Sequence, residues 1–459
     1  MSKYSRIGFA TKLGGLLAAA GSAIGLGNIW RFPTQAGQSG GSAFIIIYLL
    51  CVAIFGIPLL IAEFSIGRHA RANVGNAYRV LAPNTFWKWV GPLSVLVAFL
   101  IFCYYNVVVG WVLYYTWDSL LGTFVIMGTG NEAVQAFTNH FNSFIVHPWK
   151  PILCLLIVTA MCHFVVVSGV QAGIEKTSKV LIPGLFIIMI FLAIFASFMP
   201  GAGEGYRFLF AMDFSAITPD VVLSALGQCF YSLSIGMGLI TYASYFRRDV
   251  NLTNTAVSIA VMSSIIAVLA GIIIFPAVFS VDGMDPELGP GLVFVALPNV
   301  FNSALSSIPF LAWLIPLLFY IILLVAALTS TIFLHEVATA YVAETFGTTR
   351  HRAASYVTLG VLFLGIACSL SLGPWSEFKI FGLNIFDFID SLTAKVILPI
   401  TGLGASLFVG WKLSTRQLWT ELTSFGTVRF IWVKPFLFLV RFFVPSLIIL
   451  IMLSNFGLI

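Results

Sequence analysis

The sequence predicts an all-α membrane protein whose chain crosses the bilayer about eleven times. Of its 459 residues, 59% are hydrophobic and only 9% are charged, and the mean hydropathy is +1.02. A bilayer-spanning helix needs about 20 predominantly apolar residues. Apolar runs of that kind fall at residues 13–37, 42–67, 89–121, 151–168, 177–199, 219–245, 255–281, 308–343, 353–371, 385–411 and 434–457.

The first of these spans contains a break. Its segment GSAIGLGNIWRFP, from Gly21 to Pro33, holds three glycines within seven residues, and each costs roughly 1 kcal/mol of helix stability relative to alanine. Non-helical backbone at membrane depth persists only where protein or a polar cavity satisfies its amides and carbonyls. With Asn28 and Arg31 beside it, the break predicts a small-molecule or ion site.

A similar interruption returns in the second half of the chain. The segment LSIGMG from Leu233 repeats SAIGLG from Ser22, at a spacing of 211 residues. Interrupted spans at corresponding places of two halves are typical of secondary transporters built from inverted repeats. The alternative is that these glycines only allow close helix packing, as in GxxxG pairs.

The distribution of charge predicts an orientation. The formal net charge is +6, and placing the N-terminus in the cytoplasm gathers most basic residues at that end of the spans. The opposite end carries acids such as Asp282, Asp285, Glu287 and Asp390. This positive-inside asymmetry indicates topology rather than nucleic-acid binding, and an odd number of spans puts the C-terminus outside. The basic residues on the cytoplasmic side are Lys3, Arg6, Arg68, Arg71, Arg79, Lys88, Lys176, Lys179, Arg247, Arg248, Arg350, Arg352, Lys412, Arg416, Arg429 and Lys434.

The sequence lacks the motifs of common enzymes. All six cysteines fall within apolar spans without CxxC spacing, so neither a disulfide framework nor a zinc site is expected. His335-Glu336 begins like HExxH but continues Val-Ala-Thr, and there is no GxxxxGK phosphate loop, which argues against a zinc protease and an ATP-driven pump. We therefore expect no enzymatic activity.

Several residues inside the spans allow two interpretations. Glu63 fits a buried structural partner better than a transport residue. Tyr104 and Tyr105 each carry a hydroxyl that needs a partner inside the membrane, so one of them is expected to face the site. Gly173 and Pro183 form a G-x9-P element, which predicts either a segment that unwinds toward the cytoplasm or a static kink.

The span at 308–343 carries a patch of oxygen atoms. Ala326, Thr329 and Ser330 lie at positions i, i+3 and i+4 and therefore share one helix face. Two hydroxyls beside a backbone carbonyl are the hard oxygen ligands that alkali and alkaline-earth cations accept. The pattern predicts a cation site on this face.

Taken together, GSAIGLGNIWRFP, GQCFYSLSIGMG, TYASY and ALTS closely resemble the neurotransmitter:sodium symporter family. The resemblance covers nearly the whole chain, and the span count with the G-x9-P element is similar to the bacterial branch that carries hydrophobic amino acids. It implies the LeuT-type fold: a 5+5 inverted repeat with helices 1 and 6 unwound at mid-membrane, plus an eleventh helix. The expected divisions are residues 1–200, 201–411 and 412–459, namely the two repeats and the eleventh helix with its preceding loop.

The resemblance also implies two sodium sites made of backbone and side-chain oxygens. The second site would use Gly21, Ile24, Ala326, Thr329 and Ser330, and each of these positions matches the family pattern. The first site would use Ala23, Asn28, Ser232 and Ser263 together with the carboxylate of the substrate.

The seventh span departs from the family pattern. Anchored on AGIIIFP, the position that is usually Asn or Asp falls on Ser263, and the position that holds a glutamate in some chloride-independent relatives falls on Ala267. No carboxylate therefore replaces chloride here. Either a chloride ion binds among Tyr48, Gln228, Ser232 and Ser263, or the first cation site is weakened.

The substrate pocket implied by the resemblance contains no ionisable group that would pair with a charged side chain. Monoamine carriers place an aspartate in the first break, where this chain has Gly25, so an intact neutral amino acid with an aliphatic or aromatic side chain is expected. Tyr231 would cover the pocket. The implied lining is Ala23, Leu26, Gly27, Ile101, Tyr105, Tyr231, Ser232, Ser234, Met237, Ser330 and Leu334.

Two charge pairs are expected to gate the pathway. Arg31 and Asp387 both lie at external ends of spans and predict an outer pair, and the resemblance implies Arg6 and Glu344 as the inner pair. Lys395 lies inside a span, where it either serves transport or only extends its ammonium group to the interface.

These features predict a sodium-coupled symporter that imports a neutral, hydrophobic amino acid by alternating access across a bacterial cytoplasmic membrane. The expected cofactors are one or two Na⁺ ions, with Cl⁻ left open, and the expected partners are the amino acid and the lipid bilayer. The alternative is a transport-inactive amino-acid sensor, or a channel, on the same scaffold. Paired inner and outer gates argue against a channel, since a channel needs only one gate.

Overall fold

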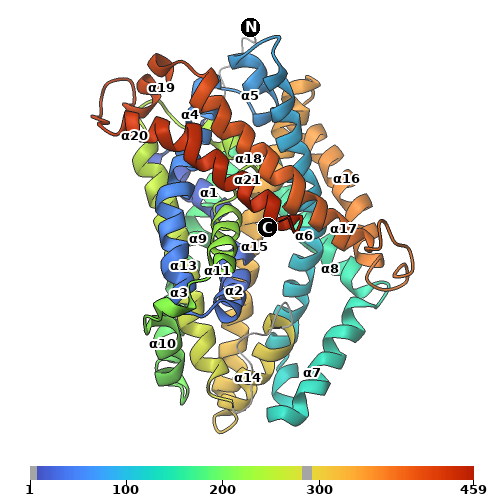
Figure 1. The fold of residues 1–459 in the computed structure, drawn as a ribbon. Coiled ribbons are helices and arrows are strands. Elements are labelled where there is room, and N and C mark those ends of the chain that lie inside the picture. Colours follow the sequence, from blue (N-terminus) through green and yellow to red (C-terminus); the bar gives the residue numbers. More distant parts are fainter. Residues whose placement is uncertain (1–7, 282–291, 459) are drawn as a thin grey trace.

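The computed structural model describes residues 8–281 and 292–458, which form a bundle of helices (Figure 1). Within these residues, nine helices are long and apolar enough to cross a membrane, or ten if one bent pair counts as a single span. The only β-type pairing in the described part is an isolated bridge between Ile380 and Leu383. The all-α prediction is therefore confirmed.

The α-helices alternate between long spans and short connecting helices. In the first half they are α1 Lys12–Ala23, α2 Phe32–Gln38, α3 Ser42–Cys51, α4 Ile57–Ala70, α5 Val74–Leu81, α6 Val90–Leu120, α7 Gly130–Ile145, α8 Lys150–Val167, α9 Lys176–Ala196 and α10 Ala202–Phe210. In the second half they are α11 Pro219–Ser232, α12 Leu239–Ala243, α13 Leu252–Val278, α14 Leu297–Ala304, α15 Pro309–Thr345, α16 Arg350–Leu370, α17 Ile385–Leu392, α18 Leu398–Leu407, α19 Thr415–Leu422, α20 Val433–Phe438 and α21 Val444–Asn455.

Several spans continue through π-helical turns, so that two labelled helices form one membrane crossing. Ser42–Ala70 joins α3 and α4, Ile385–Lys412 joins α17 and α18, and Val433–Asn455 joins α20 and α21. The π-helical segments are Gly27–Arg31, Val52–Gly56, Val170–Glu175, Leu292–Ala296, Thr393–Ile397, Phe408–Lys412 and Leu439–Phe443. Short 3₁₀ segments lie at Phe86–Trp89, Thr123–Ile126 and Phe214–Ala216.

Two of the eleven predicted spans are interrupted, as expected. The run at 13–37 forms α1 and a second helix, Gly27–Gln38, which is bent by 52° relative to α1. The run at 219–245 forms α11 and α12, with residues 233–238 outside any helix. Neither run is a continuous helix, which accounts for the smaller number of uninterrupted spans.

The first break is narrower than the glycine pattern predicts. The helix α1 continues through Gly21 and ends at Ala23, because Ile24 adopts an extended backbone with φ −104° and ψ 93°. In the second break Ser234, Gly236 and Gly238 have φ values of 52°, 79° and 103°. Glycine tolerates this left-handed region without a steric penalty, so the two glycines allow α11 to end at mid-span.

Both broken helices lie inside the bundle. α1 packs against α9, α13 and α15, and Ala19, Ala20 and Ile24 are fully buried. α11 packs against α2, α3 and α21. Figure 1 shows α7, α10 and α14 extending from the end opposite the N-terminus. The arrangement keeps the broken backbone away from lipid.

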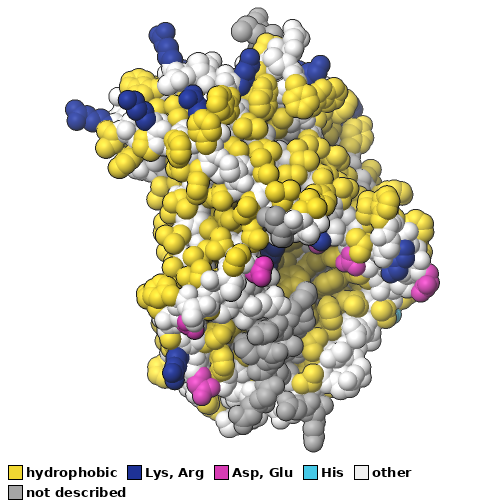
Figure 2. Space-filling view, in the orientation of Figure 1, with side chains coloured by type: hydrophobic (Ala, Val, Ile, Leu, Met, Phe, Trp, Pro, Cys, Tyr) yellow, Lys and Arg dark blue, Asp and Glu magenta, His cyan; other side chains and the backbone are white. Residues whose placement is uncertain are grey.

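Charged side chains are unevenly placed on the visible surface. Figure 2 shows most of its lysines and arginines at the end where the N-terminus lies, and its acids toward the middle and the opposite end. We call the first of these the basic end; it holds the start of α6, the end of α15 and the start of α16. This is the end for which the sequence predicts a cytoplasmic position.

Candidate functional site

The two breaks lie against each other in the structure. The hydroxyl of Ser234 donates to the carbonyl oxygen of Ser22 at 2.6 Å, and the side-chain amide of Gln228 donates to the carbonyl oxygen of Gly27 at 2.7 Å. The second broken helix and its break thus supply donors to carbonyls of the first broken span. Protein rather than lipid satisfies this backbone, which is the condition for a break at membrane depth.

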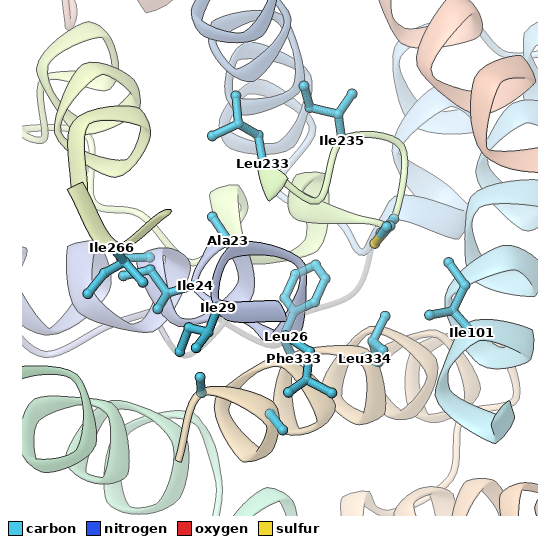
Figure 3. Packing of buried hydrophobic residues seen from close by; sticks show 14 of the residues in the cluster. Ala23, Ile24, Leu26, Ile29, Ile101, Leu233, Ile235, Ile266, Phe333 and Leu334 are labelled. Atoms are coloured by element: carbon cyan, nitrogen blue, oxygen red, sulfur yellow. The ribbon is translucent and has the colours of Figure 1, made fainter. Parts of the chain in front are cut away.

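A cavity of about 90 Å³ lies between the breaks, α6 and α15. A single water needs roughly 10–15 Å³ measured in the same way, so the space accepts a small solute. Figure 3 shows Ile101 of α6 and Phe333 and Leu334 of α15 around the first break. The lining consists of Ser22, Ala23, Gly25, Gly27, Asn28, Ile101, Tyr104, Tyr105, Tyr231, Ser232, Ser234, Met237, Ser330, Phe333 and Leu334.

All of the predicted lining residues except Leu26 border this cavity. Leu26 contributes through its backbone instead, since its N–H donates to the hydroxyl of Tyr105 at 3.2 Å. The predicted lining lacked Ser22, Gly25, Tyr104 and Phe333, and it placed Asn28 only in the first sodium site. Gly25 lies within the break motif and Tyr104 precedes Tyr105, so both had a signal, whereas Phe333 is recognisable only from the packing of α15.

Polar and apolar groups both contribute to the cavity wall. A Cβ atom at Gly25 would lie 2.5 Å from the hydroxyl oxygen of Ser330, whereas one at Gly27 would meet nothing within 4 Å. Gly25 therefore allows the Ser330 hydroxyl to approach the break closely, and Gly27 borders open space. The apolar part comes from Ile101, Met237, Phe333 and Leu334. None of the described lining residues is an acid, a lysine, an arginine or a histidine.

The first of two oxygen clusters connects α1 to α15. The hydroxyl of Thr329 lies 2.9 Å from the carbonyl oxygen of Ala326 and 3.4 Å from that of Ile24. The hydroxyl of Ser330 lies 3.3 Å from the carbonyl of Gly21 and 3.5 Å from that of Ile24. Two hydroxyl protons face a larger number of acceptor oxygens, and such a surplus fits a hard cation.

The second oxygen cluster connects the two breaks to α13. The hydroxyl of Ser263 lies 3.1 Å from the carbonyl oxygen of Ala23 and 3.2 Å from that of Ser232, and Asn28 contacts Ala23 and Ser263 through its amide nitrogen. The amide oxygen of Asn28 is buried with no hydrogen-bond partner in the structure. An unpaired buried acceptor is costly, so this oxygen is suited to a cation.

The comparison with known proteins decides the family. The model of the sodium:neurotransmitter symporter family matches residues 6–135 and 131–458. The chain belongs to this family. It is a sodium-dependent transporter and an integral membrane protein, and its relatives are transporters rather than enzymes.

Three similar proteins illustrate the breadth of this symporter family. A sodium-dependent transporter of Bacillus subtilis is 36% identical over 459 residues, which cover 100% of this chain and 99% of the relative. The sodium-dependent neutral amino acid transporter B(0)AT2 of Bos taurus is 27% identical over 60% of this chain and 41% of that protein. The crystal structure of MhsT in complex with L-phenylalanine has a TM-score of 0.87 at 40% identity, covering 98% of this chain and 100% of MhsT. The predicted LeuT-type fold is therefore confirmed.

The residues named for a possible chloride site include two neighbouring hydroxyl groups. The hydroxyls of Tyr48 and Ser232 lie 2.9 Å apart, and Ser232 contacts Ser263 through its carbonyl. Gln228 uses its amide nitrogen on Gly27, while its amide oxygen has no partner in the described structure. The Ala267 side chain is fully buried and apolar, so no carboxylate enters the cluster from that position.

Arg31 and Asp387, predicted as an outer gate pair, contact other residues in the structure. The Arg31 guanidinium lies 4.0 Å from the centre of the Tyr231 ring. Asp387 lies in the first turn of α17 and accepts a hydrogen bond from Asn384 at 2.7 Å, where a carboxylate is favoured by the helix dipole. Asp390, one turn further along α17, is hydrogen-bonded to Tyr104 and interacts electrostatically with Arg31 and Lys395. The sequence analysis named Asp390 only among the acids of the outer end and not as a partner of Arg31.

Only one member of the predicted inner pair, Glu344, lies within the described residues. Arg6 lies outside the described residues, and the carboxylate of Glu344 accepts hydrogen bonds from the backbone and side chain of Asn73, the latter at 2.6 Å. Phe9 closes this end by packing against Tyr242, Tyr245 and Phe246. The start of the described chain therefore packs against α12 and the residues that follow it.

Two further residues inside the spans have structural partners. Glu63 is buried and accepts a hydrogen bond from the backbone N–H of Gly236 at 2.7 Å, which fits its predicted structural role. Gly173 packs closely against the backbone of Val165, because a Cβ atom added at Gly173 would lie only 1.9 Å from the Val165 carbonyl oxygen. The helix that follows Gly173 continues through Pro183. In this conformation the G-x9-P element is helical throughout.

Proposed function

We propose that this symporter imports a neutral amino acid with a hydrophobic side chain, driven by sodium. The observation that carries the proposal is the cavity itself. Its apolar wall includes Ile101, Phe333 and Leu334, its described lining has no strongly charged side chain, and oxygen clusters lie on both sides of the first break. The L-phenylalanine bound to MhsT and the name of B(0)AT2 support the same substrate class.

The polar side of the cavity suits the two charged groups of an amino acid. The substrate carboxylate would face Gly27 and the hydroxyl of Tyr105, and it would complete the oxygen set of Asn28 and Ser263. The ammonium group would face backbone carbonyls of the breaks, whose C-terminal helix ends carry partial negative charge. The hydrophobic side chain would then contact Phe333 and Leu334.

Coupling follows from the elements that the oxygen clusters join. One cluster links α1 to α15, and the other links both breaks to α13. Sodium bound there stabilises the conformation in which these elements are in contact, and it is released when they separate. We propose one sodium ion at each cluster and a chloride ion among Tyr48, Gln228, Ser232 and Ser263.

We place the protein in a bacterial cytoplasmic membrane with its N-terminus inside and its C-terminus outside. The concentration of basic side chains at one end supports this orientation. The three sequence divisions at 1–200, 201–411 and 412–459 remain our proposal for the repeats and the added helix.

The test is uptake of labelled phenylalanine and leucine into proteoliposomes. We expect uptake with external sodium, loss of uptake when choline replaces sodium, and competition by neutral hydrophobic amino acids but not by charged ones. Replacing chloride with gluconate tests the anion site. Undiminished uptake in choline would overturn sodium coupling, and competition by lysine or glutamate would overturn the substrate class. Binding without counterflow would instead favour the amino-acid sensor.

A further inference from the structure

A second cavity lies outside the transport site, at the basic end of the molecule. It has a volume of about 320 Å³ and lies between α6, α15 and α16, three helices that pack against one another. This is within the range of small-ligand sites, roughly 300–1,000 Å³. Its described lining is apolar except for the hydroxyls of Tyr341 and Tyr356.

Two small residues, Ala338 and Gly360, line this groove. Ala338 is buried on α15, and a Cβ atom at Gly360 of α16 would lie 3.1 Å from the ring of Phe99. The ring of Tyr341 forms one side of the groove. It packs directly against Gly75, where a Cβ atom would overlap the ring. The depression is therefore built into the helix packing.

The groove opens toward the surrounding hydrocarbon. Tyr356, Leu359 and Phe363 of α16 are 60%, 64% and 81% exposed, and they lie at i, i+3 and i+7 on one helix face. On the α6 side, Leu96 is 45% exposed. A face of this kind contacts lipid chains in a membrane protein.

Two basic residues each come four positions before a lining residue of the groove, at the basic end of the molecule. Arg352 precedes Tyr356 by four residues on α16, which places it one turn closer to the helix start on nearly the same face. Lys88 precedes Pro92 by four residues, next to the exposed Trp89, over whose ring its ammonium group lies at 5.5 Å. Both cations are exposed. An apolar groove with basic residues at its interfacial end matches the shape and charge of an anionic phospholipid.

We propose that the groove between α6, α15 and α16 binds one anionic phospholipid, with an acyl chain along Leu96, Ala338 and Gly360 and the phosphate between Lys88 and Arg352. The aromatic rings of Trp89 and Tyr356 lie at the level of the headgroup, where such rings are favoured. Because α15 also carries Ser330 and Leu334, the lipid contacts a helix that lines the transport site.

The experiment is native mass spectrometry of the full chain in detergent, titrated with dioleoyl-phosphatidylglycerol or dioleoyl-phosphatidylcholine. Each cation contributes about fivefold to the affinity for an anionic headgroup, so the first phosphatidylglycerol is expected to bind at least tenfold more tightly than the first phosphatidylcholine. The Lys88→Gln/Arg352→Gln variant should lose most of this preference. The control variant Lys412→Gln/Arg416→Gln neutralises two other exposed cations and should keep it.

A second variant tests the acyl-chain part independently. Leu96→Trp fills the groove from its lipid-exposed side without altering the buried wall, and it should weaken the first binding event of both lipids at least threefold. Equal affinity for the two lipids, equal losses in the two charge variants, or no effect of Leu96→Trp would overturn the proposal. A dimer that Leu96→Trp dissociates would assign the groove to a second copy of the chain and would also overturn it.

Discussion

At the scale of single residues, the oxygen cluster that we propose as a sodium site forms where helical and non-helical backbone meet. Thr329 and Ser330 share one face of α15, and the end of α1 at Ala23 leaves the carbonyl of Ile24 directed at them. Neither the end of α1 nor α15 supplies enough oxygen ligands by itself to surround a cation. The cluster depends on side chains that contribute little to the apolar core.

Replacing both hydroxyls, in Thr329→Ala/Ser330→Ala, should weaken sodium binding more than folding. Loss of even one ligand worth about 1.4 kcal/mol raises the half-saturating sodium concentration about tenfold. Sodium titration of substrate binding measures this. Thr331→Ala is the matched control, because its hydroxyl bonds back to Ala327 and Leu328 of its own helix. An unchanged sodium dependence in the double variant would contradict the assignment.

At the scale of the elements, the second break is maintained by backbone that only some residues adopt. Gly236 has φ 79°, its N–H donates to Glu63, and a Cβ atom there would lie 2.6 Å from the hydroxyl of Thr401. The break is therefore fitted between α4 and α18. Its shape follows from these contacts as well as from its own glycines.

Gly236→Ala should destabilise the protein by about 1–3 kcal/mol, the usual cost of a side chain held in a strained backbone region. Gly227→Ala is the control, since Gly227 lies within α11 and a Cβ atom there meets nothing within 4 Å. That change should be neutral or stabilising, because alanine favours the helix. Thermal unfolding in detergent measures the melting temperatures of both variants. Equal melting temperatures would contradict a strained backbone at Gly236.

At the scale of the whole molecule, an ion pair connects α19, near the C-terminus, to α4 in the first part of the chain. Arg68 on α4 and Glu421 on α19 are 353 residues apart in sequence, and their charged atoms lie 2.6 Å apart. His69 also contacts the Glu421 carboxylate at 3.1 Å. Burial alone would raise the pKa of Glu421, but the hydrogen bonds from His69 and Arg68 and the charge of Arg68 outweigh it and lower that pKa.

A carboxyl group whose pKa is lowered by folding stabilises the folded state above its ordinary pKa of 4.5, and this contribution is lost as the pH falls below that value. Glu421→Gln should destabilise the protein by about 3–5 kcal/mol at neutral pH, because it leaves Arg68 buried without its partner. The substitution should also make the melting temperature change less with pH in the acid range. Glu377→Gln, at an exposed acid, is the control; an equal response would contradict this role.

Parts of the site were predictable because they depend on local spacing or on a motif. Thr329 and Ser330 follow from helix periodicity, and the breaks follow from glycines inside apolar runs. Asp390 was not predicted as the partner of Arg31 because the choice between two acids on α17 depends on Tyr104 and Arg31 of other helices. Phe333 was missed for a similar reason, since neighbouring residues of α15 look equally apolar in sequence.

By itself, the sequence determined the membrane-spanning architecture, the two breaks and the family. Apolar length, glycine content and charge asymmetry act locally along the chain, and lipid leaves few structures that satisfy the backbone. Only the tertiary structure decided which acid interacts with Arg31, how narrow the first break is and where the groove between α6, α15 and α16 lies. These depend on contacts between residues far apart in sequence, whose geometry is set when the helices pack together.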